Sequence, residues 1–167
     1  TTDLLVAKYK DYDVIVKADG DANELIAGKF EGNTDEAHEL QKLIIKEDIK
    51  GSLLDNRKVE IELPSWVKIR NIEVAKKSKI NLASDSFRYD RAGNKVEFTV
   101  DKTNGDKVEI ELEIYVSVEA DAEGDITALV SGKALGEEHE VILGKAIAPI
   151  EVTTDVKDVR IGVQKQE

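Results

Sequence analysis

Two groups of closely spaced carboxylates have the composition of calcium-binding loops. Asp19-Gly-Asp21-Ala-Asn23 places side-chain oxygens at alternate positions, as the first half of an EF-hand loop does. The remainder departs from that pattern, because the sixth position is Glu24 instead of glycine and the twelfth is Phe30. The second group comprises Asp121, Glu123 and Asp125. Both groups are calcium candidates, with solvated acidic turns as the alternative, and we predict no other metal or cofactor.

Three aromatic residues are candidates for ligand stacking. Trp66, Tyr89 and Tyr115 would form a carbohydrate-binding platform if their rings were exposed, because the apolar face of a sugar packs on an aromatic face. Packing in the core or at its rim is the competing role for Trp66, which follows Leu63-Pro64 at the start of an expected strand. Tyr115 lies on the polar side of its strand pattern, which favours exposure.

The remaining chemistry is sparse, and we predict that the chain is not an enzyme. There is no Cys, no Gly-x-Ser-x-Gly motif, and only two histidines, His38 and His139. Both histidines lie among charged residues and are expected to be exposed. Glu109, Glu111 and Glu113 form the solvated face of a strand, whereas a catalytic carboxylate is expected in a desolvated pocket.

The composition excludes several partners. The 24 Lys and Arg residues against 35 Asp and Glu residues give a net charge of −11, which repels nucleic acid and anionic lipid surfaces. Apolar stretches are far shorter than the ~20 residues of a membrane-spanning helix, so no membrane insertion is expected within this segment. The abundance of Lys and Glu without Cys or Met resembles thermophile proteins.

The elements that must position these residues are strands. From Lys107 to Glu119, apolar residues occupy every second position, which predicts a strand with one buried and one wet face. We expect Val108, Ile110, Leu112, Ile114 and Val116 to be among the most buried residues. The full set of expected strands, some of which should merge, is about Leu4–Ala7, Asp13–Lys17, Leu25–Phe30, Leu43–Lys46, Val59–Leu63, Trp66–Ile69, Ile72–Ala75, Phe87–Tyr89, Val96–Val100, Val108–Val118, Ile126–Val130, Glu140–Leu143, Ala148–Val152 and Val156–Val163.

Turn signals complete the predicted architecture. Asn104-Gly105 predicts a type I′ hairpin, and Ala92-Gly93-Asn94 predicts a second tight reversal. A short helix or turn is expected over Thr34–Glu39. Together, the strand and turn signals predict an all-β, antiparallel β-sandwich of the jelly-roll or cohesin-like type, with ~8–11 strands and at most one or two short helices. We expect residues 1–167 to form a single domain.

Several segments together resemble a known repeat. Leu43-Ile-Ile-Lys-Glu-Asp48, Gly51-Ser-Leu53 and Val59-Glu-Ile-Glu-Leu-Pro-Ser-Trp-Val-Lys-Ile69 resemble the extracellular β-sandwich repeats of Gram-positive surface proteins. Those proteins often carry S-layer homology domains or a copper-amine-oxidase N-terminal-like domain. Trp66 stands where the repeat usually has Gly. The end of the chain resembles the junction between repeats, so residues 156–167 are expected to lead into a following repeat.

The resemblance implies a non-catalytic structural or adhesive module on the bacterial cell surface, associated with an S-layer. Its expected location is extracellular, at the cell surface or cell wall. Its expected partners are neighbouring domains of the same protein and cell-wall or plant polysaccharide. Phe87-Arg-Tyr-Asp90 adds a fainter likeness to cohesins. Carbohydrate binding and cohesin-like protein docking therefore stay open as alternative functions.

Overall fold

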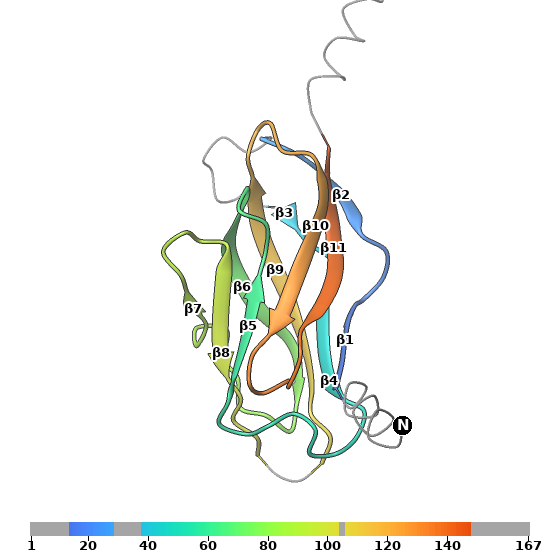
Figure 1. Cartoon of the computed structure of the whole chain (residues 1–167), viewed down its shortest axis with the longest axis vertical. Coiled ribbons are helices and arrows are strands. Elements are labelled where there is room, and N and C mark those ends of the chain that lie inside the picture. Colours follow the sequence, from blue (N-terminus) through green and yellow to red (C-terminus); the bar gives the residue numbers. More distant parts are fainter. Residues whose placement is uncertain (1–13, 29–37, 104–105, 148–167) are drawn as a thin grey trace, which may run out of the picture.

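The computed structural model describes residues 14–28, 38–103 and 106–147, and these residues form a two-sheet β-sandwich (Figure 1). The predicted all-β fold is confirmed. The described part contains no helix that could span a membrane. Its strands are β1 (Val14–Ala18), β2 (Asn23–Ile26), β3 (His38–Glu39), β4 (Leu43–Glu47), β5 (Lys58–Glu62), β6 (Val67–Ser78), β7 (Arg88–Tyr89), β8 (Lys95–Thr99), β9 (Glu109–Val118), β10 (Gly124–Ser131) and β11 (His139–Ile147).

The first sheet is built around β9. One side of β9 pairs with β4 and β3, β1 pairs with β4, and β6 pairs with the other side of β9. The second sheet has the strand order β2-β11-β10-β5-β8-β7. All these pairings are antiparallel except that of β2 with β11, which is parallel. The chain therefore passes from the first sheet to the second between β1 and β2.

The core lies between the two sheets and follows the alternation in the sequence. Val108, Ile110, Leu112, Ile114 and Val116 are each at most 1% exposed, so the predicted buried face of β9 is confirmed. The facing sheet supplies the matching inward residues of β5, β8 and β10, such as Ile61, Phe98 and Ala128. Phe98 packs edge-on against Phe87 with ring centroids 5.4 Å apart.

The predicted Asn104-Gly105 hairpin is wrong. The strands before and after it, β8 and β9, belong to different sheets, while residues 104–105 themselves lie outside the described residues. The connection is held by other contacts, because Lys102 forms a bridge with Ile80 and its backbone N–H donates to Asp55 Oδ1 at 2.9 Å. These two contacts fix the segment that follows β8, before the chain crosses to the other sheet.

The predicted reversal at Ala92-Gly93-Asn94 is confirmed. It joins β7 to β8 as a hairpin, in which Arg88 lies opposite Glu97 and Tyr89 lies opposite Val96. Gly93 has a φ of 85°, a conformation that glycine adopts without strain. Its N–H donates to the backbone oxygen of Asp90 at 3.1 Å.

Other boundaries shift. The predicted strands Trp66–Ile69 and Ile72–Ala75 merge into β6, whose pairing with β9 is interrupted by bulges at Arg70 and Ala75. Of the expected helix or turn over Thr34–Glu39, only His38 and Glu39 lie within the described residues, and they form β3. Outside the described residues lie the predicted strands Leu4–Ala7, Ala148–Val152 and Val156–Val163 and the junction at 156–167.

A buried ion pair locks one end of the sandwich. The Glu47 side chain has no solvent exposure, and its Oε2 accepts hydrogen bonds from Lys102 Nζ at 2.8 Å and from the Leu53 N–H at 2.9 Å. Its Oε1 accepts from the Val108 N–H at 2.9 Å. Lys102 Nζ also donates to the Leu53 carbonyl at 2.8 Å. Burial alone would raise the pKa of the Glu47 carboxyl, but these hydrogen bonds outweigh it and hold that pKa below its ordinary value.

Candidate functional site

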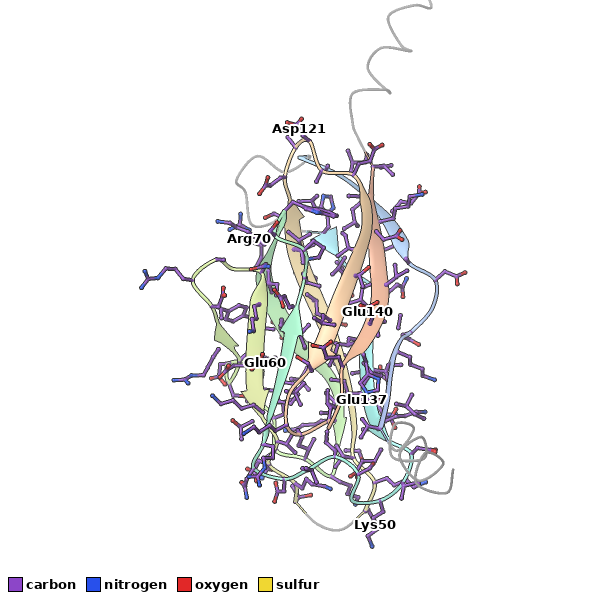
Figure 2. The ribbon with its side chains drawn as sticks, in the orientation of Figure 1. Lys50, Glu60, Arg70, Asp121, Glu137 and Glu140 are labelled. Carbon is purple, nitrogen blue, oxygen red and sulfur yellow. The ribbon has the colours of Figure 1, made fainter. Side chains whose placement is uncertain are left out.

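The acidic calcium candidates lie on exposed turns. Asp19 and Asp21 are exposed in the link between β1 and β2. Asp121 and Glu123 are exposed in the turn between β9 and β10, with Asp121 at the upper end of the molecule in Figure 2, and Asp125 is exposed on β10. Within the described ranges, no three or more His, Asp or Glu side chains are grouped so that they would hold a metal ion.

The two histidines are less exposed than expected. His38 lies opposite Val116 and therefore faces the same side of the first sheet as the core. It is half-buried, and its Nε2 is buried with no hydrogen-bond partner among the described residues. His139 is half-buried at the start of β11. The prediction that both are exposed is wrong, because flanking charges do not show which face of a strand a side chain occupies.

The three candidate aromatics do not share one surface. Trp66 lies in the turn between β5 and β6, half-buried against the core. Tyr115 is half-buried on the polar face of β9 in the first sheet, and its hydroxyl donates to Glu113 Oε1 at 3.1 Å. Tyr89 belongs to β7 in the second sheet and is 42% exposed. Of the three, Tyr89 presents the most accessible ring.

Tyr89 spans the open side between the two sheets. It shares the inward direction of Val96, its partner on β8, but β7 is the last strand of its sheet and the ring is covered only in part. Its hydroxyl hydrogen-bonds the backbone of Ile72 on β6, in the opposite sheet. Burial and the negative charge of Glu73 raise the pKa of the Tyr89 hydroxyl, and the bond to Ile72 opposes them. The hydroxyl of Tyr89 therefore points toward β6 of the opposite sheet.

A hollow of about 420 Å³ lies beside this ring. It is lined by the β7–β8 hairpin: Arg88, Tyr89, Asp90, Lys95, Val96 and Glu97. Lys95 Nζ lies 3.1 Å from Glu60 Oε1, and the hydrogen bond and charge of Glu60 raise the pKa of the lysine. Glu97 lies 3.0 Å from Lys58 Nζ. Tyr89 and Val96 face inward, whereas Lys95 and Glu97 face the outer side of the sheet with Glu60 and Lys58, so the ring and these charged groups lie on opposite faces of the hairpin.

The charged outer face of the hairpin can bind polar groups, and the partly exposed ring of Tyr89 lies on its other face. Carboxylates accept hydrogen bonds from hydroxyl groups, guanidinium and ammonium groups donate them, and the tyrosine ring offers an apolar face. The sequence reasoning selected Tyr89 but missed Arg88, Asp90, Lys95 and Glu97. Their signal is the tight turn at Gly93, which brings the two strands side by side.

Sequence comparison adds nothing further, since no family model and no curated protein matches the chain. The fold does have counterparts among solved structures. The N-terminal domain of the Streptococcus gordonii adhesin Sgo0707 matches with a TM-score of 0.51 at 9% identity, over 82% of this chain and 33% of that one. The Bacillus cereus major pilin subunit BcpA gives 0.48 at 19% identity, over 81% of this chain and 39% of that one.

A third structure, the collagen adhesin CNA from S. aureus, gives a TM-score of 0.42 at 7% identity, covering 80% of this chain and 51% of that one. The chain thus spans about a third to a half of the length of these structures. At these identities the likeness concerns the fold. The fold of this chain is similar to that of a bacterial adhesin domain.

Proposed function

We propose that this chain is a non-catalytic structural or adhesive module of a bacterial cell-surface protein, associated with an S-layer. The observation that carries the proposal is the direction of the chain through the sandwich. β1, whose Val14 pairs with Glu47, begins near one end of the sandwich, and β11 ends at the other end (Figure 1). A module that is entered at one end and left at the other suits a string of domains projecting from a surface.

Two further observations support the proposal. The solved structures with a similar fold include an adhesin domain, for which the TM-score exceeds 0.5. The surface is highly charged: carboxylates such as Glu60 and Glu140 line the outer face of the second sheet (Figure 2). A face of this kind remains hydrated and does not require a covering layer.

Surface labelling of intact cells tests this proposal. An antibody raised against residues 14–147 should stain unbroken cells of the source organism, and a chaotrope that strips the S-layer should release the stained protein. Staining that appears only after the cells are broken would contradict the surface location. Staining that survives removal of the S-layer would contradict only the association with that layer and would leave the surface location intact.

Carbohydrate binding is the second candidate function, favoured by the hollow beside Tyr89. The ligand would be a cell-wall or plant polysaccharide whose sugar ring stacks on the partly exposed ring of Tyr89. Retention on insoluble xylan, cellulose, chitin and isolated cell wall is the assay. Tyr89→Ala should abolish retention, whereas Tyr115→Ala, on the other sheet, should leave it unchanged. Equal retention by both variants would refute this function.

Cohesin-like docking is less well supported by the described surface. A docking face of that kind would be a contiguous apolar patch on one sheet. The large apolar residues that are exposed in the described part are dispersed: Ile49 and Leu54 in the loop after β4, Tyr89 on β7 and Ile142 on β11.

A further inference from the structure

The first and last described parts of the chain pair directly with each other. Asn23, Glu24, Leu25 and Ile26 of β2 lie opposite Gly144, Lys145, Ala146 and Ile147 of β11, in parallel orientation. The Ala27 N–H extends this contact by donating to the Ile147 carbonyl at 2.9 Å. Just before β2, β1 pairs along its whole length with β4 through five residue pairs. Both of the terminal strand segments are therefore held by ladders that run along the long axis of the domain (Figure 1).

Tension between the two ends would act along these ladders. Because β2 and β11 run in the same direction, a pull on the N-terminal side and a pull on the C-terminal side move them past each other. The hydrogen bonds between the two strands run roughly perpendicular to the direction of pulling, so they all bear the force at the same time. The same pull draws β1 lengthwise past β4, so its five pairs are also loaded together. Under this end-to-end pull, β1, β2 and β11 are therefore not detached one hydrogen bond at a time.

We propose that the β1–β2 segment, held against β4 and β11, is a shear clamp that resists unfolding when the domain is stretched from its ends. The lower end of the clamp is anchored, because Val14 pairs with Glu47, whose carboxylate is bonded to Lys102, Leu53 and Val108. The inference goes beyond the proposed function, since it depends on topology and holds or fails wherever the protein resides.

Comparison of two pulling directions in one protein tests the clamp. The chain contains no Cys, so a single engineered thiol gives one defined attachment point. In the first geometry, force is applied to the two chain ends. In the second, it is applied to the N-terminal end and to Asp48→Cys, an exposed position beside Glu47, so that β1 is peeled from β4 one pair at a time. Forced unfolding reports the barrier along the loaded direction, whereas folding stability is the same in both measurements.

The expected result is an unfolding force several-fold higher for end-to-end pulling than for peeling. Equal forces would overturn the proposal, because they would show that resistance comes from general stability and not from the ladder geometry. The pulling experiment does not depend on where the protein lies in the cell. Failure of the clamp can therefore be distinguished from failure of the proposed function, which is tested by labelling intact cells.

A reversible cross-link gives a second test. Glu24 and Lys145 are exposed partners in the β2–β11 register, so Glu24→Cys with Lys145→Cys should form a disulfide. In the oxidised form, force would pass through the disulfide, and the residues between positions 24 and 145 would not extend. After reduction, the same molecule should unfold with its full extension at the wild-type force. An unfolding force of the reduced molecule no higher than the force measured for peeling would refute the clamp.

Discussion

Glu47→Gln preserves the volume of the buried side chain and removes its charge. An amide has only one acceptor oxygen, so it cannot accept the hydrogen bonds from Lys102 Nζ, Leu53 N–H and Val108 N–H together. Wherever the amide NH₂ lies, it faces a buried donor. Breaking a buried ion pair by removing one partner costs about 3–5 kcal/mol. We expect a loss at the lower end of that range, because the Lys102 side chain is 14% exposed and keeps some access to water.

The same residue predicts a pH dependence. The pKa of Glu47 in the folded protein lies below its ordinary value of 4.5. On acidification, the unfolded chain therefore takes up this proton first, and folding stability falls. The contribution of Glu47 is complete above the unfolded pKa and is lost as pH falls through the lower, folded pKa. Glu47→Gln lacks this titration, so the stability difference between the wild type and the variant should narrow in acid.

Urea unfolding, followed by circular dichroism at neutral and acidic pH, measures both effects. Glu60→Gln is the matched control, since Glu60 pairs with Lys95 at 3.1 Å but 33% of its side chain is exposed. Exposed pairs contribute about 0–1 kcal/mol, so this variant should lose little stability. A loss for Glu47→Gln no larger than that of the control would refute the locking role of the buried pair.

Three further outcomes are expected. Leu112→Ala should lower the free energy of unfolding by about 2–5 kcal/mol, because Leu112 is fully buried; a negligible loss in a urea titration would contradict its place in the core. Gly132→Ala should lower Tm more than Gly136→Ala, because both have positive φ but only the Cβ at Gly132 would meet a backbone oxygen, that of Lys58, at 2.2 Å; equal shifts would count against this packing. Calcium followed by a chelator should leave Tm unchanged, and a rise that Asp121→Asn abolishes would establish a site in the β9–β10 turn.

Local alternation was sufficient to predict much of the fold. Strands such as β9, β5 and β8 each have one wet face, so every second residue is polar and the pattern is unambiguous. Within β6 the alternation changes phase between Ile69 and Ile72, and the structure places a bulge there, at Arg70. The sequence reasoning interpreted the same phase change as two separate strands.

Long-range features were not accessible in this way. The turn preference of Asn104-Gly105 cannot show that the next strand pairs in the other sheet, because pairing depends on distant residues. Tyr89 lies against Ile72 of the opposite sheet, and a strand pattern does not show which strands of the two sheets lie next to each other. Glu47 did leave a signal: it occupies the inward parity set by Leu43 and Ile45, where a carboxylate requires buried partners.

The bulges in β6 bear on how such modules behave when crowded together. β6 is the longest strand, and among the described residues it pairs only with β9, which leaves its other edge open to a strand from another molecule. The bulges at Arg70 and Ala75 interrupt that edge, and the Val74 N–H already donates a hydrogen bond to Ser84 Oγ at 2.9 Å. A continuous new ladder cannot form along such an edge. Copies of this domain held close together should therefore remain separate folded units instead of merging their sheets.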